Sequence, residues 1–302
     1  MPHENPELLK VSQLTFETTE NAVELLSDFL LGAGSLGVAE DIKPGGGYEL
    51  SSYFPMDTDL SSLMEDLRGF IAFVLETIPG AEVGPVRAEL LDRTSWEVWK
   101  TLLGKVRAGK RVVVVPPWEE HEPGGGEVVV EINPSLAFGT GHHETTRLCI
   151  AAIERHHEGG RVKRMLDVGC GSGILAITAS KLGVPDVTAF DTDPVAMKES
   201  VKNAERNSVA GKVKLFCGYI QSVTGEYDLI VANVYLEPIF LMREEFKKRL
   251  APGGTLVLSG IPAMRRGEAV EGMLKAGFTL SAEHVDGEWV ALELALHRDA
   301  GA

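Results

Sequence analysis

A short run of glycines with acidic residues on both sides is the part of this sequence best suited to hold a small ligand. Residues 167–173 read Asp-Val-Gly-Cys-Gly-Ser-Gly, between an apolar segment and a helical pattern that begins near Ile174. A strand, a tight glycine turn and a helix in that order place backbone N–H groups where a ligand can approach closely. Asp191 follows Gly169 by about 20 residues, the spacing at which an acidic side chain holds a ribose hydroxyl.

Two cofactor classes compete for this motif. A nicotinamide dinucleotide site usually has Gly-x-Gly-x-x-Gly, and Asp191 would serve that cofactor as well. Here the third glycine, Gly173, comes one position early, and Asp167 stands two positions before the first glycine. Methyltransferases that resemble this chain have an acidic residue there, close to the charged amino-acid end of S-adenosylmethionine. We therefore predict methyl transfer rather than hydride transfer; a tight turn without a ligand is the third alternative.

Asn233 is the second position that could take part in chemistry. It ends a predicted strand, and open α/β sheets bind their ligands at the carboxyl ends of the strands. Amino-methylating enzymes of this class often carry Asn-Pro-Pro-Tyr there, whose amide and carbonyl groups hold a planar nitrogen. Residues 233–236 read Asn-Val-Tyr-Leu, which favours an aliphatic amine as the acceptor. The alternative is a turn residue that caps the strand.

The elements that would position these residues alternate between strand and helix. A helix is predicted from Gly141 to about His157, and the alternation that follows predicts a Rossmann-like, parallel, doubly wound α/β sheet. The final strands, 279–285 and 289–296, are separated only by a hairpin turn, so we expect the last strand to be antiparallel, as in class I methyltransferases. The preceding strands are expected at 165–169, 187–191, 213–217, 227–233 and 255–260.

The front of the chain has a different pattern, in which strands and helices follow the order βαββαβ. This order is typical of the ferredoxin-like α+β sandwich, a fold with no single function. The expected elements are a strand at 8–18, a helix from Thr19 to Gly32 or Gly34, a hairpin of 35–42 with 48–54, a helix at 59–78 and a strand at 83–91. We predict a ferredoxin-like substrate-recognition domain at 1–94, a linker helix and strands at 95–140, and the methyltransferase domain at 141–302.

Composition excludes several classes of protein. Of the 302 residues 44% are hydrophobic and 24% are charged, and no apolar run approaches the roughly 20 residues of a membrane span. No basic segment leads into an apolar one at the start, so we expect a cytoplasmic protein without a secretory signal. The three cysteines are far apart and odd in number, and we expect free thiols and no metal site.

Negative charge is concentrated at the front. Residues 1–95 contain 17 acidic and 5 basic residues, a net charge of −12, whereas the whole chain has −15. Such a surface repels phosphate backbones and attracts a basic partner. We therefore expect no direct specificity for nucleic acid; improved solubility is the alternative explanation of the charge.

Residues 133–146 connect the chain with a family. They read Asn-Pro-Ser-Leu-Ala-Phe-Gly-Thr-Gly-His-His-Glu-Thr-Thr and closely resemble the Ala-Phe-Gly-Thr-Gly-x-His-x-Thr-Thr loop of the methyltransferases that act on large-subunit ribosomal protein eleven. The resemblance extends over nearly the whole chain and includes 99–100, 114–118, 231–233 and 287–289. It implies methylation of lysine side chains and the N-terminal amine of a basic ribosomal protein, free or on the ribosome, that the front domain captures.

The same resemblance implies which residues contact the cofactor. A loop over its methionine end would begin with Phe138 and Gly139 and reach Gly141. Asp167 and Gly171 of the glycine motif belong to this predicted site. The remaining cofactor-contacting positions are Thr146, Gly169, Asp191 and Asn233.

The residue that removes the proton from the amine is left open by the sequence. Transfer from a sulfonium needs a neutral amine and no strong general base. His143 could accept that proton, and a structural hydrogen-bonding role accounts for it equally.

The chain departs from the family pattern at two places. The family usually has Asp-Pro-Gly where residues 133–135 read Asn-Pro-Ser, and aromatic-Lys-Pro where residues 103–105 read Leu-Gly-Lys. Both departures concern the substrate more than methyl transfer. The alternatives are therefore a lysine methyltransferase of another protein, such as a flavoprotein subunit, and a cofactor-binding module without turnover. A monomer is expected.

Overall fold

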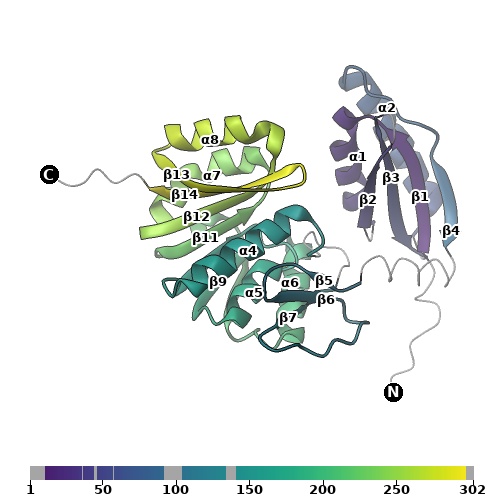
Figure 1. The fold of residues 1–302 in the computed structure, drawn as a ribbon. Helices are drawn as coiled ribbons and strands as arrows, with labels where there is room; N and C mark the ends of the chain where they lie inside the picture. Colours follow the sequence, from purple (N-terminus) through teal and green to yellow (C-terminus); the bar gives the residue numbers. More distant parts are fainter. Residues whose placement is uncertain are drawn as a thin grey trace. The chain divides into compact units, whose positions relative to one another are not determined.

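The computed structural model describes residues 11–35, 37–43, 46–56, 58–91, 104–133 and 141–296. Contacts divide the chain into two compact units, Met1–Leu102 and Leu103–Ala302, which we call the front unit and the C-terminal unit (Figure 1). Residues 95–103 and 134–140 of the predicted linker at 95–140 lie outside the described residues. The division at residues 94 and 140 stays a prediction.

The front unit is a four-stranded antiparallel sheet with two helices on one face (Figure 1). Its strand order β2-β3-β1-β4 and its βαββαβ sequence confirm the predicted ferredoxin-like fold. Alternate residues of the central strands, including Leu14, Phe16, Leu50 and Phe54, are fully buried beneath the helices. The elements are β1 (Val11–Thr18), α1 (Glu20–Gly32), β2 (Gly37–Ile42), β3 (Tyr48–Pro55), α2 (Leu60–Thr77) and β4 (Arg87–Leu91).

The C-terminal unit is built on a seven-stranded sheet with the order β10-β9-β8-β11-β12-β14-β13. Only β14 runs antiparallel to its neighbours in this sheet. This arrangement confirms the predicted fold class, including the antiparallel last strand. The strands are β8 (Arg164–Val168), β9 (Asp186–Asp191), β10 (Val213–Cys217), β11 (Tyr227–Asn233), β12 (Leu250–Pro262), β13 (Phe278–Asp286) and β14 (Trp289–Leu296).

Helices cover both faces of this sheet, and each face has its own apolar core. On β8, Met165 belongs to one core and Leu166 to the other; burial on both sides is typical of parallel sheets. None of the helices in the described part of the chain combines the length and apolarity that a membrane crossing needs. The helices are α4 (Glu144–Glu158), α5 (Ile174–Leu182), α6 (Pro194–Arg206), α7 (Leu236–Arg249) and α8 (Arg266–Lys275).

A small sheet of β5 (Val106–Arg107), β6 (Val112–Val115) and β7 (Val128–Glu131) packs into the same core as α4 and α5. The side chain of Glu154 in α4 holds this small sheet against the helix by hydrogen bonds. Its carboxylate is 4% exposed and accepts backbone N–H bonds from three consecutive residues. The donors are Lys110, Arg111 and Val112, at 2.6, 2.7 and 3.1 Å.

A second buried carboxylate joins α4 to the final hairpin. Glu293 of β14 accepts hydrogen bonds from Arg155 at 2.7 Å and from His156 at 2.9 Å. His284 of β13 also contacts Glu293, at 3.2 Å. Burial alone would raise the pKa of Glu293, but the bonds from His156 and Arg155 outweigh it and lower the pKa to about 2. The carboxylate is therefore charged at neutral pH and holds the helix against the strand.

We predict that Glu154→Gln destabilises the C-terminal unit by about 1–3 kcal/mol, because a carboxamide has one acceptor oxygen and its NH₂ would face backbone donors. Urea-induced unfolding would measure the loss. Glu158→Gln, on the same helix, is the matched control, because within the described residues Glu158 makes one exposed contact, with Lys110 at 3.5 Å. Equal stability of the two variants would contradict this role of Glu154.

Candidate functional site

The glycine motif forms the loop between β8 and α5. Gly169 has a φ of 68° and Gly173 a φ of 80°, a backbone conformation that side chains other than glycine rarely tolerate. A Cβ atom on Gly169 would also lie 2.6 Å from a methyl carbon of Val234. Gly173 is the N-cap of α5 and offers no side chain there. In the first turn of the helix, the N–H of Ile174 is accepted by the hydroxyl of Ser172 at 3.4 Å and the N–H of Ala176 by the carboxylate of Asp167 at 3.0 Å.

Asp191 lies at the carboxyl end of β9, where the sequence predicts an acidic residue for a ribose. Its Oδ2 accepts the N–H of Gly171 at 2.9 Å, and its Oδ1 accepts the N–H of Asp193 at 3.0 Å. The carboxylate thus joins the glycine loop to the loop after β9. Each of its oxygens can accept a further hydrogen bond.

Asp167, in β8, is fully buried. Its Oδ2 accepts the N–H of Ala176 at 3.0 Å, whereas its Oδ1 has no hydrogen-bond partner among the described residues. Burial raises the pKa of this carboxyl group to about 7; the Ala176 N–H acts in the opposite direction, and the charge of Asp191 adds to the increase. A cation placed beside Oδ1 would favour the charged form.

Strand register brings other predicted residues to the same edge. On β11, Val231 pairs with Asp167, so Asn233 lies one position beyond the end of β8. Asn233 also pairs with Ser259 of β12, whose hydroxyl donates to the carbonyl of Thr145 at 3.3 Å. The first turn of α4 therefore meets the carboxyl ends of β11 and β12.

Three of the predicted residues at this edge share an unusual property. Each has a buried polar side-chain atom that finds no hydrogen-bond partner within the part of the chain that the structure describes, although buried polar groups are normally paired. Such atoms suit a ligand that supplies both hydrogen bonds and a positive charge. They are Thr146 Oγ1, Asp167 Oδ1 and Asn233 Oδ1.

His143 is the N-cap of α4. Its Nδ1 accepts the N–H of Thr145 at 3.2 Å and lies 2.7 Å from the hydroxyl of the same residue. The imidazole ring packs edge-on against Trp289, with 4.9 Å between ring centroids. Nδ1 therefore caps the helix, and in the neutral ring Nε2, 4.0 Å from Glu144, carries the hydrogen and acts as a donor.

The turn of the last hairpin contacts the first turn of α4, which was not predicted from the sequence. Arg147 of α4 donates to the carboxylate of Asp286 at 2.8 and 3.0 Å. The N–H of Ala263, just after β12, donates to the carbonyl of Glu288 at 2.7 Å. These contacts join residues far apart in the chain, so they cannot be predicted from a local sequence pattern.

Ser259 and Gly260 are further residues of the edge that the sequence did not single out. A Cβ atom on Gly260 would lie 2.6 Å from the backbone oxygen of Val234, so the chain after Asn233 can pass close only because Gly260 has no side chain. A glycine at the carboxyl end of a predicted strand was the available signal. Phe138 and Gly139, predicted to cover the cofactor, lie outside the described residues, as do Pro134 and Ser135.

Comparison with known proteins indicates one family. A family model described as ribosomal protein L11 methyltransferase (PrmA) matches residues 10–297. Relatives named ribosomal protein L11 methyltransferase, from Exiguobacterium sp. and Pelotomaculum thermopropionicum, are each 35% identical, and both alignments cover 94% of this chain and 98% of the relative. The crystal structure of the ribosomal protein L11 methylase from Lactobacillus delbrueckii subsp. bulgaricus is 29% identical; the match covers 65% of this chain and 100% of that chain, with a TM-score of 0.60.

These matches cover both units, and they agree with the glycine motif, the antiparallel last strand and the loop before α4. They confirm the resemblance seen in the sequence and the predicted methyl donor, S-adenosylmethionine. The chain therefore belongs to the ribosomal protein L11 methyltransferase family.

Proposed function

We propose that this chain transfers methyl groups from S-adenosylmethionine to amine nitrogens of ribosomal protein L11, namely lysine side chains and the N-terminal amine. The observation that carries the proposal is the convergence of unpaired buried polar atoms on Asp167, Thr146 and Asn233 at the carboxyl edge of a methyltransferase sheet. The names of the relatives supply the protein substrate. The absence of the Asn-Pro-Pro-Tyr prolines after Asn233 supports an aliphatic amine.

The residues at this edge fit S-adenosylmethionine, which when bound supplies an electrophilic methyl group. Asp167 would face its ammonium group, because the free carboxylate oxygen is buried and lacks a partner. Asp191 would accept hydrogen bonds from the ribose hydroxyls with its remaining lone pairs. Gly169 and Gly171 would let the backbone approach the cofactor, and Thr146 would donate its unpaired hydroxyl.

The remaining chemistry concerns the amine. A lysine with its ordinary pKa of about 10.4 is protonated at neutral pH, so the amine must lose a proton in a partly desolvated site before it can attack. The side-chain oxygen of Asn233 would accept a hydrogen bond from the neutral amine and orient its lone pair toward the methyl group, at about 3 Å in line. The amine would lose this proton to solvent, because Nδ1 of His143 accepts the N–H of Thr145 and Nε2 therefore already carries the hydrogen of the neutral ring.

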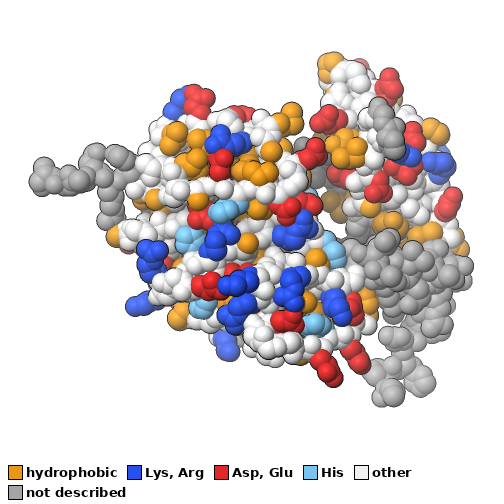
Figure 2. Space-filling model, in the orientation of Figure 1, with side chains coloured by type: hydrophobic (Ala, Val, Ile, Leu, Met, Phe, Trp, Pro, Cys, Tyr) orange, Lys and Arg blue, Asp and Glu red, His pale blue; other side chains and the backbone are white. Residues whose placement is uncertain are grey.

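The front unit would capture the protein substrate, because it has the opposite charge to a basic ribosomal protein. Figure 2 shows acidic side chains spread over this unit with few basic ones among them. Residues 96–302, in contrast, contain 27 acidic and 24 basic residues. Attraction between unlike charges raises association rates, so we assign capture to the front unit and methyl transfer to the C-terminal unit.

Incubation of the protein with labelled S-adenosylmethionine and unmethylated large ribosomal subunits tests this function. We expect label in L11 and, by mass spectrometry of its peptides, methyl groups on lysine Nζ atoms and the N-terminal nitrogen. Free L11 should also be labelled, whereas fully methylated L11 should not. Tight cofactor binding without label in any large-subunit protein would rule the proposal out.

The pH dependence of cofactor binding tests the role of Asp167. Its carboxyl group, with a pKa of about 7, must lose its proton to pair with an ammonium group. We therefore expect the dissociation constant of S-adenosylmethionine to fall about fivefold between pH 6 and pH 7, as the deprotonated fraction grows. Asp167→Asn should bind more weakly, with a flat profile over this range. A wild-type protein whose affinity is also flat would contradict the pairing.

Replacement of Asn233 tests how the amine is held. We expect Asn233→Ala to lower kcat by about 100-fold, because it removes a hydrogen bond that orients the amine in the transition state. Asn233→Asp, which keeps an acceptor oxygen, should retain more activity. The rates of single-turnover methylation of L11 would measure the effect of both substitutions. An unchanged rate in Asn233→Ala would show that Asn233 does not hold the amine.

A further inference from the structure

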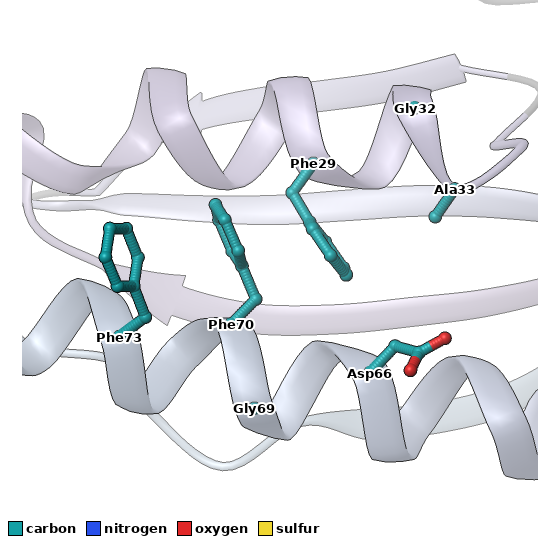
Figure 3. Close-up of a pocket in the computed structure, with 7 residues that line it drawn as sticks. All are labelled: Phe29, Gly32, Ala33, Asp66, Gly69, Phe70 and Phe73. Carbon is teal, nitrogen blue, oxygen red and sulfur yellow. The ribbon is translucent and has the colours of Figure 1, made fainter.

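A groove of about 580 Å³ lies between α1 and α2, on the face of the front unit that the helices form. Figure 3 shows the rings of Phe29 and Phe70 stacked on each other between the two helices, with Phe73 further along α2. The first two rings stack with their centroids 4.3 Å apart, and Phe73 is 52% exposed. The groove therefore exposes aromatic surface, chiefly that of Phe73, whereas Phe29 and Phe70 are half-buried and pack against the core of the unit.

Gly69 lines this groove from the middle of α2. Glycine inside a helix costs about 0.5–1 kcal/mol relative to alanine. A Cβ atom at this position would meet nothing within 4 Å, so packing within the front unit does not require the glycine. The glycine leaves open the space beside its own position on the helix.

The two helices that form the groove are strongly acidic in sequence. In sequence, α1 and α2 together contain six acidic residues and one basic residue, Arg68. Asp66 lines the groove itself, and Figure 3 shows its carboxylate at the end near Ala33. A second copy of this face would be repelled by the like charge, and so would a phosphate backbone. A basic polypeptide with an apolar side chain matches both properties.

We propose that this groove is the docking site for a lysine- or arginine-rich segment of the protein substrate, which inserts a large apolar side chain against Phe29, Phe70 and Phe73. A basic side chain of the same segment pairs with Asp66. Buried apolar anchors surrounded by complementary charge are the usual source of affinity and specificity at protein interfaces. The proposal rests on the proposed function, because it takes ribosomal protein L11 as that substrate.

The groove can be filled without harm to the fold. Gly69→Leu places a large side chain in the open space and improves the helix propensity of α2. Ala72→Leu is the matched control, because Ala72 is exposed on the same helix and does not line the groove. Asp66→Lys reverses the charge in the groove.

Binding of unmethylated L11 to the full chain, measured by calorimetry without methyl donor, tests the proposal. We expect Gly69→Leu to weaken binding at least tenfold and Asp66→Lys about fivefold, whereas Ala72→Leu binds as the wild type does. In methylation assays the KM for L11 should rise by similar factors, with kcat and the dissociation constant of S-adenosylmethionine unchanged. Thermal unfolding should show that both leucine variants are folded.

The outcomes separate this proposal from the proposed function. If the wild type methylates L11 and Gly69→Leu binds it equally well, the function stands and the docking site is refuted. If L11 binds through Gly69 and Asp66 but receives no methyl group, the docking site stands and the function fails. A dimer that Gly69→Leu dissociates, with L11 affinity unchanged, would overturn the proposal in favour of self-association, and sedimentation would detect it.

Discussion

The burial of the Asp167 carboxyl group is the constraint on which the site depends. One oxygen accepts a hydrogen bond from Ala176 and the other accepts none. The increase in pKa from 3.8 to about 7 corresponds to about 4 kcal/mol against the charged form. An apolar residue would serve the core of β8 better, so the carboxylate is retained at a cost in stability. A cationic ligand beside the free oxygen would recover part of that free energy, which explains why an acid at the head of the glycine loop suits a cofactor with an ammonium group.

Asp167 can hold a ligand in one position only if the elements around it are themselves fixed in place. The start of α4 is joined to β12 by the hydrogen bond from Ser259 to the carbonyl of Thr145. It is joined to the last hairpin by the ion pair of Arg147 with Asp286. Further along the helix, Glu293 adds its charged contacts with Arg155 and His156. Because the antiparallel β14 lies directly beside β12, the same strand fixes both the helix and the turn. The final hairpin therefore positions residues that are more than a hundred positions earlier in the chain.

Much of this architecture could be predicted from the sequence, because parallel strands buried on both faces appear as continuous apolar runs between glycine and acidic turns. Asp167, Asp191 and Asn233 were identifiable because each follows or ends such a run. Contacts such as that between Glu154 and the backbone at 110–112 were not, since a buried acid has no distinguishing local pattern. The groove was missed for a related reason: Phe29 and Phe70 recur at helical spacing, as core residues do, and only the packing of α1 against α2 shows that their rings line an open surface.

Separation of capture from chemistry has a physical consequence for an enzyme that would modify several amines of one protein. If affinity comes from the front unit, a bound substrate stays near the C-terminal unit and each amine is present there at a high effective concentration. The edge around Asn233 then needs to recognise only a neutral amine, without the residues that flank it. This requirement agrees with the site as we propose it, where a single amide oxygen, Asn233 Oδ1, is assigned to the amine. On this proposal the front unit selects the protein, and the C-terminal unit accepts any of its amines that reaches the site. One chain can therefore be specific for a protein and still methylate amines at several positions.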